Sequence, residues 1–382
     1  MHGPRLSIAL AHDWLCGFRG GEAVLDRIVS NANAWGDVAG LWVMVHDGRP
    51  VTAAIDGLPV HTSSLQEIPG AATHLRRHLL PFYPRAVADL SQRLREHHRR
   101  HPIDLLISTS SAAVKGIEAP TSVPHICYCH TPPRYLWSQV DQYDSQGLVT
   151  RVGLRVAGPL LRAWDRATAA NVTVFAANSH HTAREIERCY GRSSVVVHPP
   201  VRTGMFTPDP STPREDFWLI AGALEPYKRA DLAIRAAQLA RVPIIIAGGG
   251  SQYAPLRRAF EGPGVTFLGR VSDAALIDLY RRARLLIFPQ VEDFGIVAVE
   301  AQACGLPVLA RRAGGALDTV LEGRTGAYFD DPDPAEIAAA AMHVPALCSV
   351  ACRENALRFS EDAFDRKLKA LVGSVIGDEK LC

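Results

Sequence analysis

Short apolar runs alternate with helical segments along almost the whole chain, and this alternation limits its possible folds more than any other feature. A short, continuous apolar run is typical of a strand that is buried on both faces of a parallel sheet. Parallel strands need crossover helices between them, so the pattern predicts a doubly wound α/β fold. The predicted strands are residues 6–10, 41–45, 104–109, 125–129, 172–177 and 195–198, followed by 217–222, 243–248, 265–268, 285–288 and 308–310.

A proline pair, Pro199 and Pro200, separates the two series of strands, and a stretch rich in Pro, Thr and Asp follows it. Such a composition is typical of a linker between domains. The chain has 382 residues, which is enough for two hydrophobic cores. We therefore expect two Rossmann-like domains that face each other across a cleft. They comprise residues 1–198 and 199–360, and a final helix in residues 361–382 packs back on the first domain.

The stretch of residues 285–307 predicts a strand, a loop that carries Glu292, and a helix that carries Glu300. The helix is expected to begin near Ile296 and to end at Gly305. Its N-terminus would direct free N–H groups and a partial positive charge to the carboxyl edge of the sheet, which suits an anionic ligand. Because the two carboxylates would repel phosphates, their expected partners are the neutral hydroxyls of a sugar or a ribose. The alternative is a pair of solvated glutamates.

Seven residues separate Glu292 from Glu300, with Phe294 and Gly295 between them and Cys-Gly-Leu-Pro-Val after them. This pattern resembles the signature of the family 4 retaining glycosyltransferases. The resemblance implies a GT-B fold, in which Glu292 lies beside the donor sugar and Glu300 binds the ribose hydroxyls of the nucleotide. It also implies that Phe294, Gly295 and Ile296 bind the donor.

Two cations, Lys228 and Arg229, follow the strand that ends at Gly222 and precede the next helix. Positive charge at such a place suits a diphosphate leaving group, on which negative charge grows. The segment is similar to the phosphate-binding loop of the family, which implies that Lys228 contacts the diphosphate and that Gly222 and Arg229 bind the donor. Many family members have an Arg where this chain has Ala223, and whether Arg229 compensates is left open. A surface Lys-Arg pair is the alternative.

A glycine pair, Gly20 and Gly21, follows the first predicted strand and opens a helix. Glycines let backbone amides come close to a phosphate, although a tight turn explains the pair equally well. The pair matches the glycine-rich loop of the family, which implies that it binds the donor. In the same loop, His12 and Asp13 are predicted to reach the acceptor.

The segment His-Thr-Pro-Pro-Arg-Tyr-Leu-Trp begins at His130, directly after a predicted strand. An isolated His is more often structural than functional. The segment is nearly identical, however, to one in a mannosyltransferase-like branch of the family. This resemblance implies that His130 hydrogen-bonds a hydroxyl of the reacting sugar and that Arg134 contacts the acceptor or a phosphate. It favours GDP-mannose as the donor, with UDP-sugars next.

Two further loops complete the predicted donor site. Gly248 and Gly249 follow one strand and are predicted to pass close to the nucleotide. Arg270 and Val271 follow the next strand, where family members hold the base against backbone atoms. Asp318 stands where many relatives have a Glu, and its role is left open.

Composition limits the partners. A net charge of +2 gives no support to nucleic-acid binding, and the eight cysteines show no zinc spacing. Because no strand ends in an Asp-x-Asp pair, we predict that neither a metal nor another cofactor is required. No signal peptide and no apolar run near 18 residues is visible, which favours a cytoplasmic protein. The arginine-rich stretch of residues 73–102 predicts peripheral attachment to the anionic inner face of the cell membrane, with a solvated helix face as the alternative.

Together these motifs predict a retaining glycosyltransferase that moves a hexose onto a saccharide or a lipid-linked saccharide during polysaccharide or glycolipid synthesis. His130, Lys228 and Glu292 are the predicted catalytic residues, and no protein general base is expected. A catalytically idle nucleotide-sugar-binding subunit and a UDP-sugar transferase remain alternatives. The chain lacks an evident acid–base set for an epimerase, an evident pyridoxal phosphate lysine for a phosphorylase, and the Gly-x-Gly-x-x-Gly loop of an NAD-dependent oxidoreductase.

Overall fold

A computed structural model of the protein describes residues 5–73, 75–138, 148–344 and 349–381. The chain divides into two compact units. Unit 1 comprises Met1–His198 and Asp365–Cys382, and unit 2 comprises Pro199–Phe364. The second boundary between the units therefore falls within the last long helix, α14 (Glu361–Ile376).

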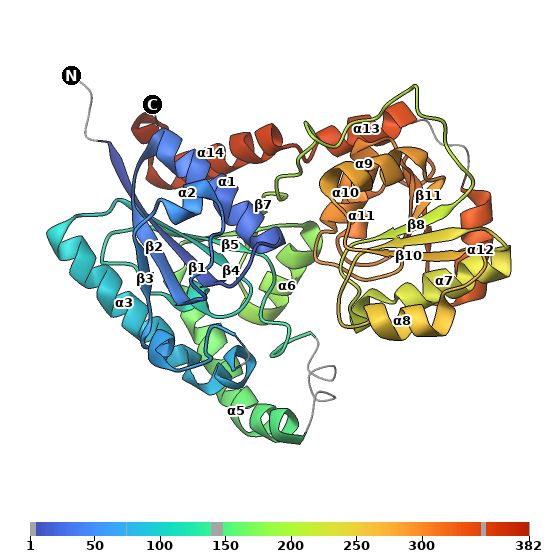
Figure 1. The fold of residues 1–382 in the computed structure, drawn as a ribbon. Helices are drawn as coiled ribbons and strands as arrows, with labels where there is room; N and C mark the ends of the chain where they lie inside the picture. Colours follow the sequence, from blue (N-terminus) through green and yellow to red (C-terminus); the bar gives the residue numbers. More distant parts are fainter. Residues whose placement is uncertain (1–4, 74, 139–147, 345–348, 382) are drawn as a thin grey trace. The chain divides into compact units, whose positions relative to one another are not determined.

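Unit 1 contains a seven-stranded sheet in the order β3-β2-β1-β4-β5-β6-β7, and every neighbouring pair of strands is parallel. Helices lie on both faces of this sheet (Figure 1). The strands are β1 (Leu6–Leu15), β2 (Gly36–His46), β3 (Val60–Thr62), β4 (Leu105–Ser110), β5 (His125–Cys129), β6 (Val174–Ala177) and β7 (Ser194–Val196). The helices are α1 (Gly20–Trp35), α2 (Ala53–Asp56), α3 (Tyr83–Arg100), α5 (Leu148–Ala167) and α6 (His180–Tyr190), with short 3₁₀ turns η1 (Ser64–Glu67), η2 (Arg76–His78), η3 (Leu80–Phe82), η4 (Val114–Gly116), η5 (Thr168–Asn171) and η7 (Asp378–Leu381).

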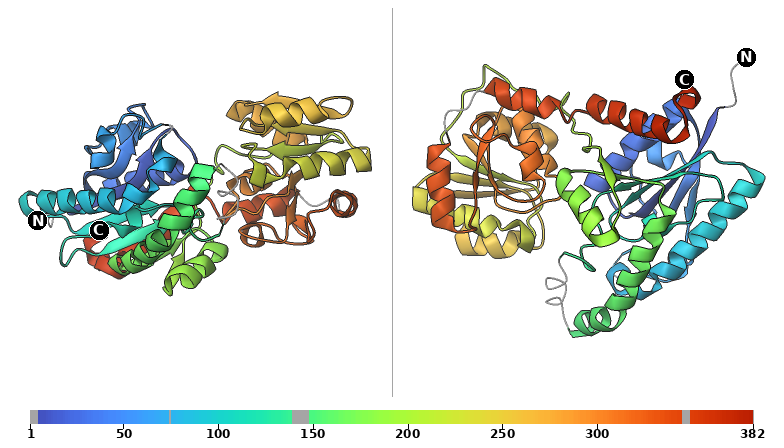
Figure 2. Two further views of the ribbon diagram at one scale, coloured as in Figure 1. Left: turned by 90° about the horizontal axis from the view of Figure 1, so that it is seen from below. Right: turned by 180° about the vertical axis from the view of Figure 1, so that it is seen from behind.

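Unit 2 contains a six-stranded sheet in the order β10-β9-β8-β11-β12-β13, again parallel throughout. The further views in Figure 2 show helices on both sides of its strands as well. The strands are β8 (Trp218–Ala221), β9 (Ile244–Ala247), β10 (Val265–Gly269), β11 (Leu285–Phe288), β12 (Val308–Arg311) and β13 (Gly326–Phe329). The helices are α7 (Ala230–Ala240), α8 (Tyr253–Phe260), α9 (Asp273–Arg282), α10 (Ile296–Ala303), α11 (Ala316–Thr319), α12 (Pro334–His343) and α13 (Ser349–Leu357), with the 3₁₀ turn η6 (Pro226–Lys228).

The core of unit 2 explains why its strands read as continuous apolar runs. Alternate residues of a strand point to opposite faces of the sheet. In β11, Leu286 and Phe288 join one buried cluster, whereas Leu285 and Ile287 join the cluster on the other face. Because helices cover both faces, no position of the strand is left for a polar residue, as predicted for a doubly wound sheet.

Helix α3, which contains most of the arginine-rich stretch, has one side buried in the core and an outer side that carries arginines. Its apolar side, which includes Val87, Leu90 and Leu94, is buried in the core of unit 1. Two arginines on its outer side form ion pairs with exposed or half-exposed carboxylates, Arg93 with Asp89 and Arg95 with Glu118. The core thus takes up the apolar side of α3, which favours the solvated-face alternative for this helix. No helix in the described ranges is both long and apolar enough to cross a membrane.

Three elements were not predicted, namely β3, β13 and α13. Two of them are short strands with half-buried residues, which gives them a weak apolar signal. Strand β1 also runs five residues further than predicted, to Leu15. The extension contains His12 and Asp13, whose polar side chains are buried and hydrogen-bonded inside unit 1.

Candidate active site

The order of strands in unit 2 reverses between β8 and β11, so the loops that leave these two strands diverge. Ligands of doubly wound sheets bind at such a point, beyond the carboxyl ends of the strands. The loop after β8 carries Lys228 and the loop after β11 carries Glu292. Their side chains form an ion pair, with 2.8 Å between Nζ of Lys228 and Oε1 of Glu292. The two predicted catalytic residues of this unit are therefore direct neighbours.

Two glycine loops border this ion pair. A Cβ atom on Gly222 would lie 3.9 Å from Nζ of Lys228 and 3.6 Å from the side chain of Val297, in the first turn of α10. A Cβ atom on Gly248 would lie only 1.7 Å from the backbone oxygen of Gly222, so no other residue fits there. A Cβ atom on Gly249 would lie 3.1 Å from Cγ of Arg270, so Gly249 lies against this side chain. The structure thus brings the predicted Gly222, Gly248 and Arg270 loops together.

Helix α10 begins beside the ion pair. Its N-cap, Gly295, has φ +92°, and a Cβ atom there would lie 2.9 Å from the ring of Phe288. Phe294 is buried and packs edge-to-face on Phe359, at 5.4 Å between ring centroids. The side chain of Phe294 therefore belongs to the core, and only its backbone is suited to contact a donor. Ile296 is half-buried against the same core.

A glycine that the sequence analysis did not single out as a site residue supports the Glu292 loop. The backbone N–H of Gly315 donates to the carbonyl of Glu292 at 2.8 Å. A Cβ atom on Gly315 would lie 2.3 Å from Cα of Phe294, so the close approach requires glycine. The predicted Asp318 lies shortly afterwards, half-buried in α11, and its role stays open.

The second glutamate of the motif, Glu300, lies on α10 near two charged residues that form an ion pair with each other. Arg202 and Asp273 are 2.8 Å apart. Burial raises the pKa of Glu300 to about 7, with Arg202 opposing the shift and Asp273 adding to it. Arg202 was missed because it lies in the stretch interpreted as a linker. The carboxyl group of Glu300 is thus set to change its charge near neutral pH.

Arg229 and Val271 are two further predicted donor residues of unit 2. Arg229 has a left-handed backbone, φ 50°, and its guanidinium makes two hydrogen bonds to Asp231, at 3.1 and 3.2 Å. This pairing holds the guanidinium on its own helix and argues against its replacing the cation that Ala223 lacks. Val271 is half-buried against the core of unit 2, so its backbone is the part available to a base.

In unit 1 the strand order reverses between β1 and β4. His12 and Asp13 lie on β1, not in the predicted loop. The carboxylate of Asp13 accepts hydrogen bonds from the backbone N–H groups of residues 111–114, at 2.6 to 2.9 Å. These bonds make Asp13 an anchor for the turn after β4, which corrects its prediction as an acceptor ligand. Nδ1 of His12 is hydrogen-bonded to Oγ1 of Thr109 at 2.5 Å, and Nε2 of His12 lies 3.9 Å from Oε1 of Glu22.

His130 lies beside the predicted glycine pair. Gly20 and Gly21 are the first two residues of α1, and a Cβ atom on Gly21 would lie 3.7 Å from Nε2 of His130 and 3.8 Å from the ring of His12. The Nε2 atom of His130 is buried and has no hydrogen-bond partner among the described residues. Burial lowers the pKa of His130 to about 4, with help from His12. The imidazole is therefore neutral at pH 7 and has one ring nitrogen available for a ligand. Arg134 lies four residues further on and is half-buried.

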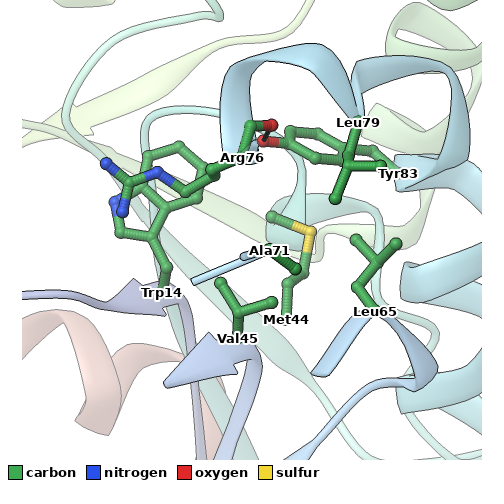
Figure 3. A pocket seen from close by; sticks show the side chains of 8 residues that line it. All are labelled: Trp14, Met44, Val45, Leu65, Ala71, Arg76, Leu79 and Tyr83. Atoms are coloured by element: carbon green, nitrogen blue, oxygen red, sulfur yellow. Dashed lines mark hydrogen bonds between the residues drawn. The ribbon is translucent and has the colours of Figure 1, made fainter. Parts of the chain in front are cut away.

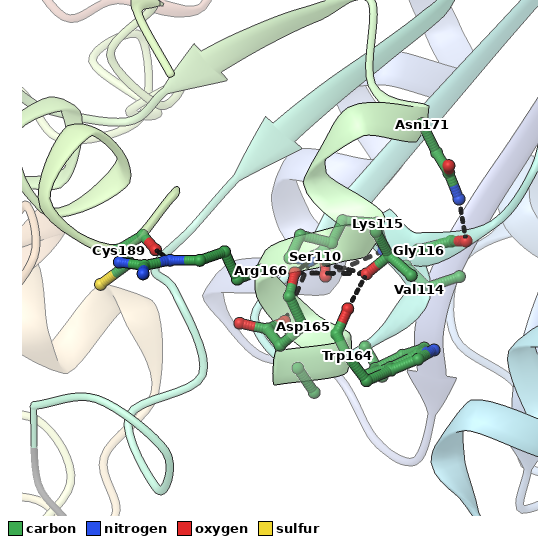
Figure 4. A network of polar contacts seen from close by, with 12 residues as sticks. Ser110, Val114, Lys115, Gly116, Trp164, Asp165, Arg166, Asn171 and Cys189 are labelled. Atoms are coloured by element: carbon green, nitrogen blue, oxygen red, sulfur yellow. Dashed lines mark hydrogen bonds and ion pairs between the residues drawn. The ribbon is translucent and has the colours of Figure 1, made fainter. Parts of the chain in front are cut away.

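A buried polar network in unit 1 surrounds Lys115 and Asp165 (Figure 4) and includes Trp137, at the end of the His130 segment. Lys115 and Asp165 form an ion pair of 3.0 Å with almost no exposure to solvent. The same Asp165 accepts a hydrogen bond of 2.7 Å from the indole of Trp137. Lys115 also lies over the ring of Tyr190, 4.6 Å from its centroid. Because these residues are far apart in the sequence, the network could not be predicted from a local sequence pattern.

A narrow, mostly apolar pocket without room for a water molecule lies at the carboxyl ends of β1 and β2 (Figure 3). The guanidinium of Arg76 stacks over the ring of Trp14, 4.6 Å from its centroid. Most of the other lining comes from residues 51–105. The lining residues are Trp14, Met44, Val45, Leu65, Ala71, Arg76, Leu79 and Tyr83.

Two parallel, doubly wound units, each with polar side chains at its switch point, define an α/β protein built from two Rossmann-like units. Solved structures share this fold over nearly the whole chain. Sucrose-phosphate synthase from Thermosynechococcus elongatus matches with a TM-score of 0.73 at 17% identity, over 97% of this chain and 99% of that one. HepE from Anabaena in complex with UDP matches with a TM-score of 0.68 at 19% identity, over 97% of this chain and 100% of that one.

Sequence comparison gives the family. Residues 46–204 match the model "Glycosyltransferase Family 4", and residues 206–346 match "Glycosyl transferases group 1". The chain belongs to family 4 of the glycosyltransferases, and its fold is GT-B. A D-inositol 3-phosphate glycosyltransferase of Mycolicibacterium smegmatis is 39% identical over 189 residues, which is 43% of this chain and 44% of that protein. One from Mycobacterium tuberculosis is 36% identical over 195 residues, 45% and 41% of the respective chains. The matched region thus spans less than half of each relative.

Proposed function

We propose that this protein transfers a hexose from a nucleoside diphosphate sugar to a saccharide or lipid-linked saccharide, with retention of the anomeric configuration. The observation that carries the proposal is the Lys228–Glu292 ion pair beside the start of α10. A cation suits a diphosphate and a carboxylate suits sugar hydroxyls, and the N-terminus of a helix also favours an anion, so this arrangement supports the proposal. Glu300 would bind the ribose, and His130 would contact the sugar.

We propose GDP-mannose as the donor, because the His130–Trp137 segment resembles that of mannosyltransferases. UDP-sugars are the alternative, supported by the structures of HepE with UDP and with UDP-glucose. The names of the sequence relatives suggest a phosphorylated cyclitol as one acceptor to test. We propose a lipid-linked acceptor on the basis of the arginine-rich stretch of residues 73–102 and of the resemblance to the family. Such an acceptor would place the reaction at the cytoplasmic face of a membrane.

The first test is hydrolysis of a panel of nucleotide sugars by the purified protein, with and without a metal chelator, beside Glu292→Ala. We expect slow release of GDP or UDP from one donor, insensitive to the chelator and lost in the variant. Binding without turnover, even when acceptors are supplied, would favour an idle nucleotide-sugar-binding subunit. If no nucleotide sugar binds, the proposal is wrong.

The raised pKa of Glu300 predicts that donor binding depends on pH. Ribose hydroxyls donate more strongly to an ionised carboxylate than to a neutral carboxyl group, so binding favours the ionised form and releases a proton. Because the pKa of Glu300 is about 7 in the free protein, affinity should fall as the pH drops from 8 to 6. We expect a decrease of about fivefold to tenfold, since each further pH unit below the pKa costs up to tenfold.

Calorimetry with an intact nucleotide sugar measures this effect, because its phosphates do not titrate in this range. Glu300→Gln serves as the control, since its amide has no charge to lose. The variant should bind more weakly at pH 8 and show a flat profile. A flat profile in the native protein would refute the assignment of Glu300 to the ribose.

A further inference from the structure

The side chain of Asn178 lies directly after β6, at the same edge of the sheet as His130, which follows the neighbouring strand β5. Only 7% of Asn178 is exposed. Its Nδ2 group donates a hydrogen bond of 2.8 Å to the backbone carbonyl of His130. That bond fixes the orientation of the amide, because only the nitrogen can donate to a carbonyl.

The other end of this amide is unused. Oδ1 of Asn178 is buried and accepts no hydrogen bond from any residue that the structure describes. A buried carbonyl oxygen without a donor costs about 1–3 kcal/mol, so native proteins rarely keep one without a reason. The neighbouring His130 has the same property at Nε2. Two adjacent strand ends therefore each carry a buried polar atom that has no hydrogen-bond partner among the described residues.

We propose that Oδ1 of Asn178 binds a hydroxyl group of a substrate sugar. The proposal rests on the proposed function and adds a binding residue to its site. A sugar hydroxyl is the chemical group that fits, because it is neutral and donates one hydrogen bond to a carbonyl oxygen. Charged phosphate does not fit, since the carbonyl oxygen would repel it. The neutral imidazole of His130 is suited to a second hydroxyl at the same edge.

The sugar belongs either to the donor or to the acceptor, and two measurements separate these sources. Asn178→Ala should weaken binding by about tenfold, the loss expected for one buried hydrogen bond. If the hydroxyl belongs to the donor, the Kd of the intact nucleotide sugar rises tenfold while that of the nucleoside diphosphate alone is unchanged. If it belongs to the acceptor, the acceptor KM rises tenfold and both Kd values stay the same.

Asn171→Ala is the matched control. Asn171 is in the same unit and donates a hydrogen bond of 2.8 Å from its amide to the backbone oxygen of Gly116, away from the carboxyl edge. It should lower stability without changing either binding constant. If Asn178→Ala behaves like this control, Asn178 is merely structural and the inference is overturned.

Two further arms keep the test decisive. If Asn178→Ala fails to fold, Asn178→Ser removes the same carbonyl oxygen with a smaller loss of packing, and the same comparison applies to it. A monodeoxy analogue that lacks the bound hydroxyl should lose about tenfold in affinity for the native protein and nothing further for the variant; loss of the same factor by both proteins for every analogue overturns the inference. If the native protein itself binds no nucleotide sugar, the proposed function has failed, whatever Asn178 does.

Discussion

Replacing Lys228 with Met is expected to lower the rate of sugar transfer by about 100-fold to 1,000-fold. The ammonium group lies where a diphosphate would gain negative charge as the glycosidic bond breaks, and removing one such preorganised group costs a factor of this size. The Lys228 side chain is half-buried, and methionine has a similar volume. The variant should therefore lose the positive charge without a large change in packing. Initial rates at saturating donor measure the effect.

Arg229→Met is the matched control for this variant. It also removes one positive charge, from the adjacent residue, but the guanidinium of Arg229 is paired with Asp231. We expect its rate to stay within about threefold of the native value, because a partly exposed ion pair contributes little. Equal losses in the two variants would show that general positive charge matters and not the position of Lys228.

Glu292→Gln separates the two members of the ion pair. A nucleoside diphosphate would compete with Glu292 for Lys228, because the two side chains form an ion pair of 2.8 Å. The uncharged variant should therefore bind the nucleoside diphosphate several-fold more tightly while it transfers sugar more slowly. Weaker binding by the variant would mean that Glu292 is no competitor for Lys228.

The sequence predicted those parts of the fold and site that depend on local patterns. Strand β11 was predicted with its observed bounds because residues on both of its faces are apolar. Lys228 and Glu292 were both assigned to the donor site from their resemblance to motifs of the family, and their side chains form an ion pair. Strands β3 and β13 were missed, since short strands with half-buried residues lack this signal.

Where a polar side chain points could not be predicted. Asp13 looked like a ligand, yet its carboxylate is satisfied by the amides of a turn about 100 residues away. Asn178 drew no attention, because a single Asn after a strand is common; its importance depends on which atom of its amide has a partner. Such assignments require the tertiary structure.

The buried ion pair between Lys115 and Asp165 leads to the largest expected effect on stability. Asp165→Asn should lower the free energy of unfolding by about 3–5 kcal/mol, because it leaves the ammonium group of Lys115 buried without a countercharge. Lys115→Met should cost a similar amount for the same reason.

Combining Lys115→Met with Asp165→Leu should cost less than the sum of the two single changes, since it removes both charges together and leaves mainly the indole of Trp137 without its acceptor. Urea unfolding of unit 1, followed by fluorescence and circular dichroism, measures these differences. Arg188→Gln, which breaks an exposed ion pair with Glu185, should stay within about 1 kcal/mol of the native value. Strictly additive losses in the combined variant would mean that the two charges do not depend on each other, and the network would then not be what holds the His130–Trp137 segment in place.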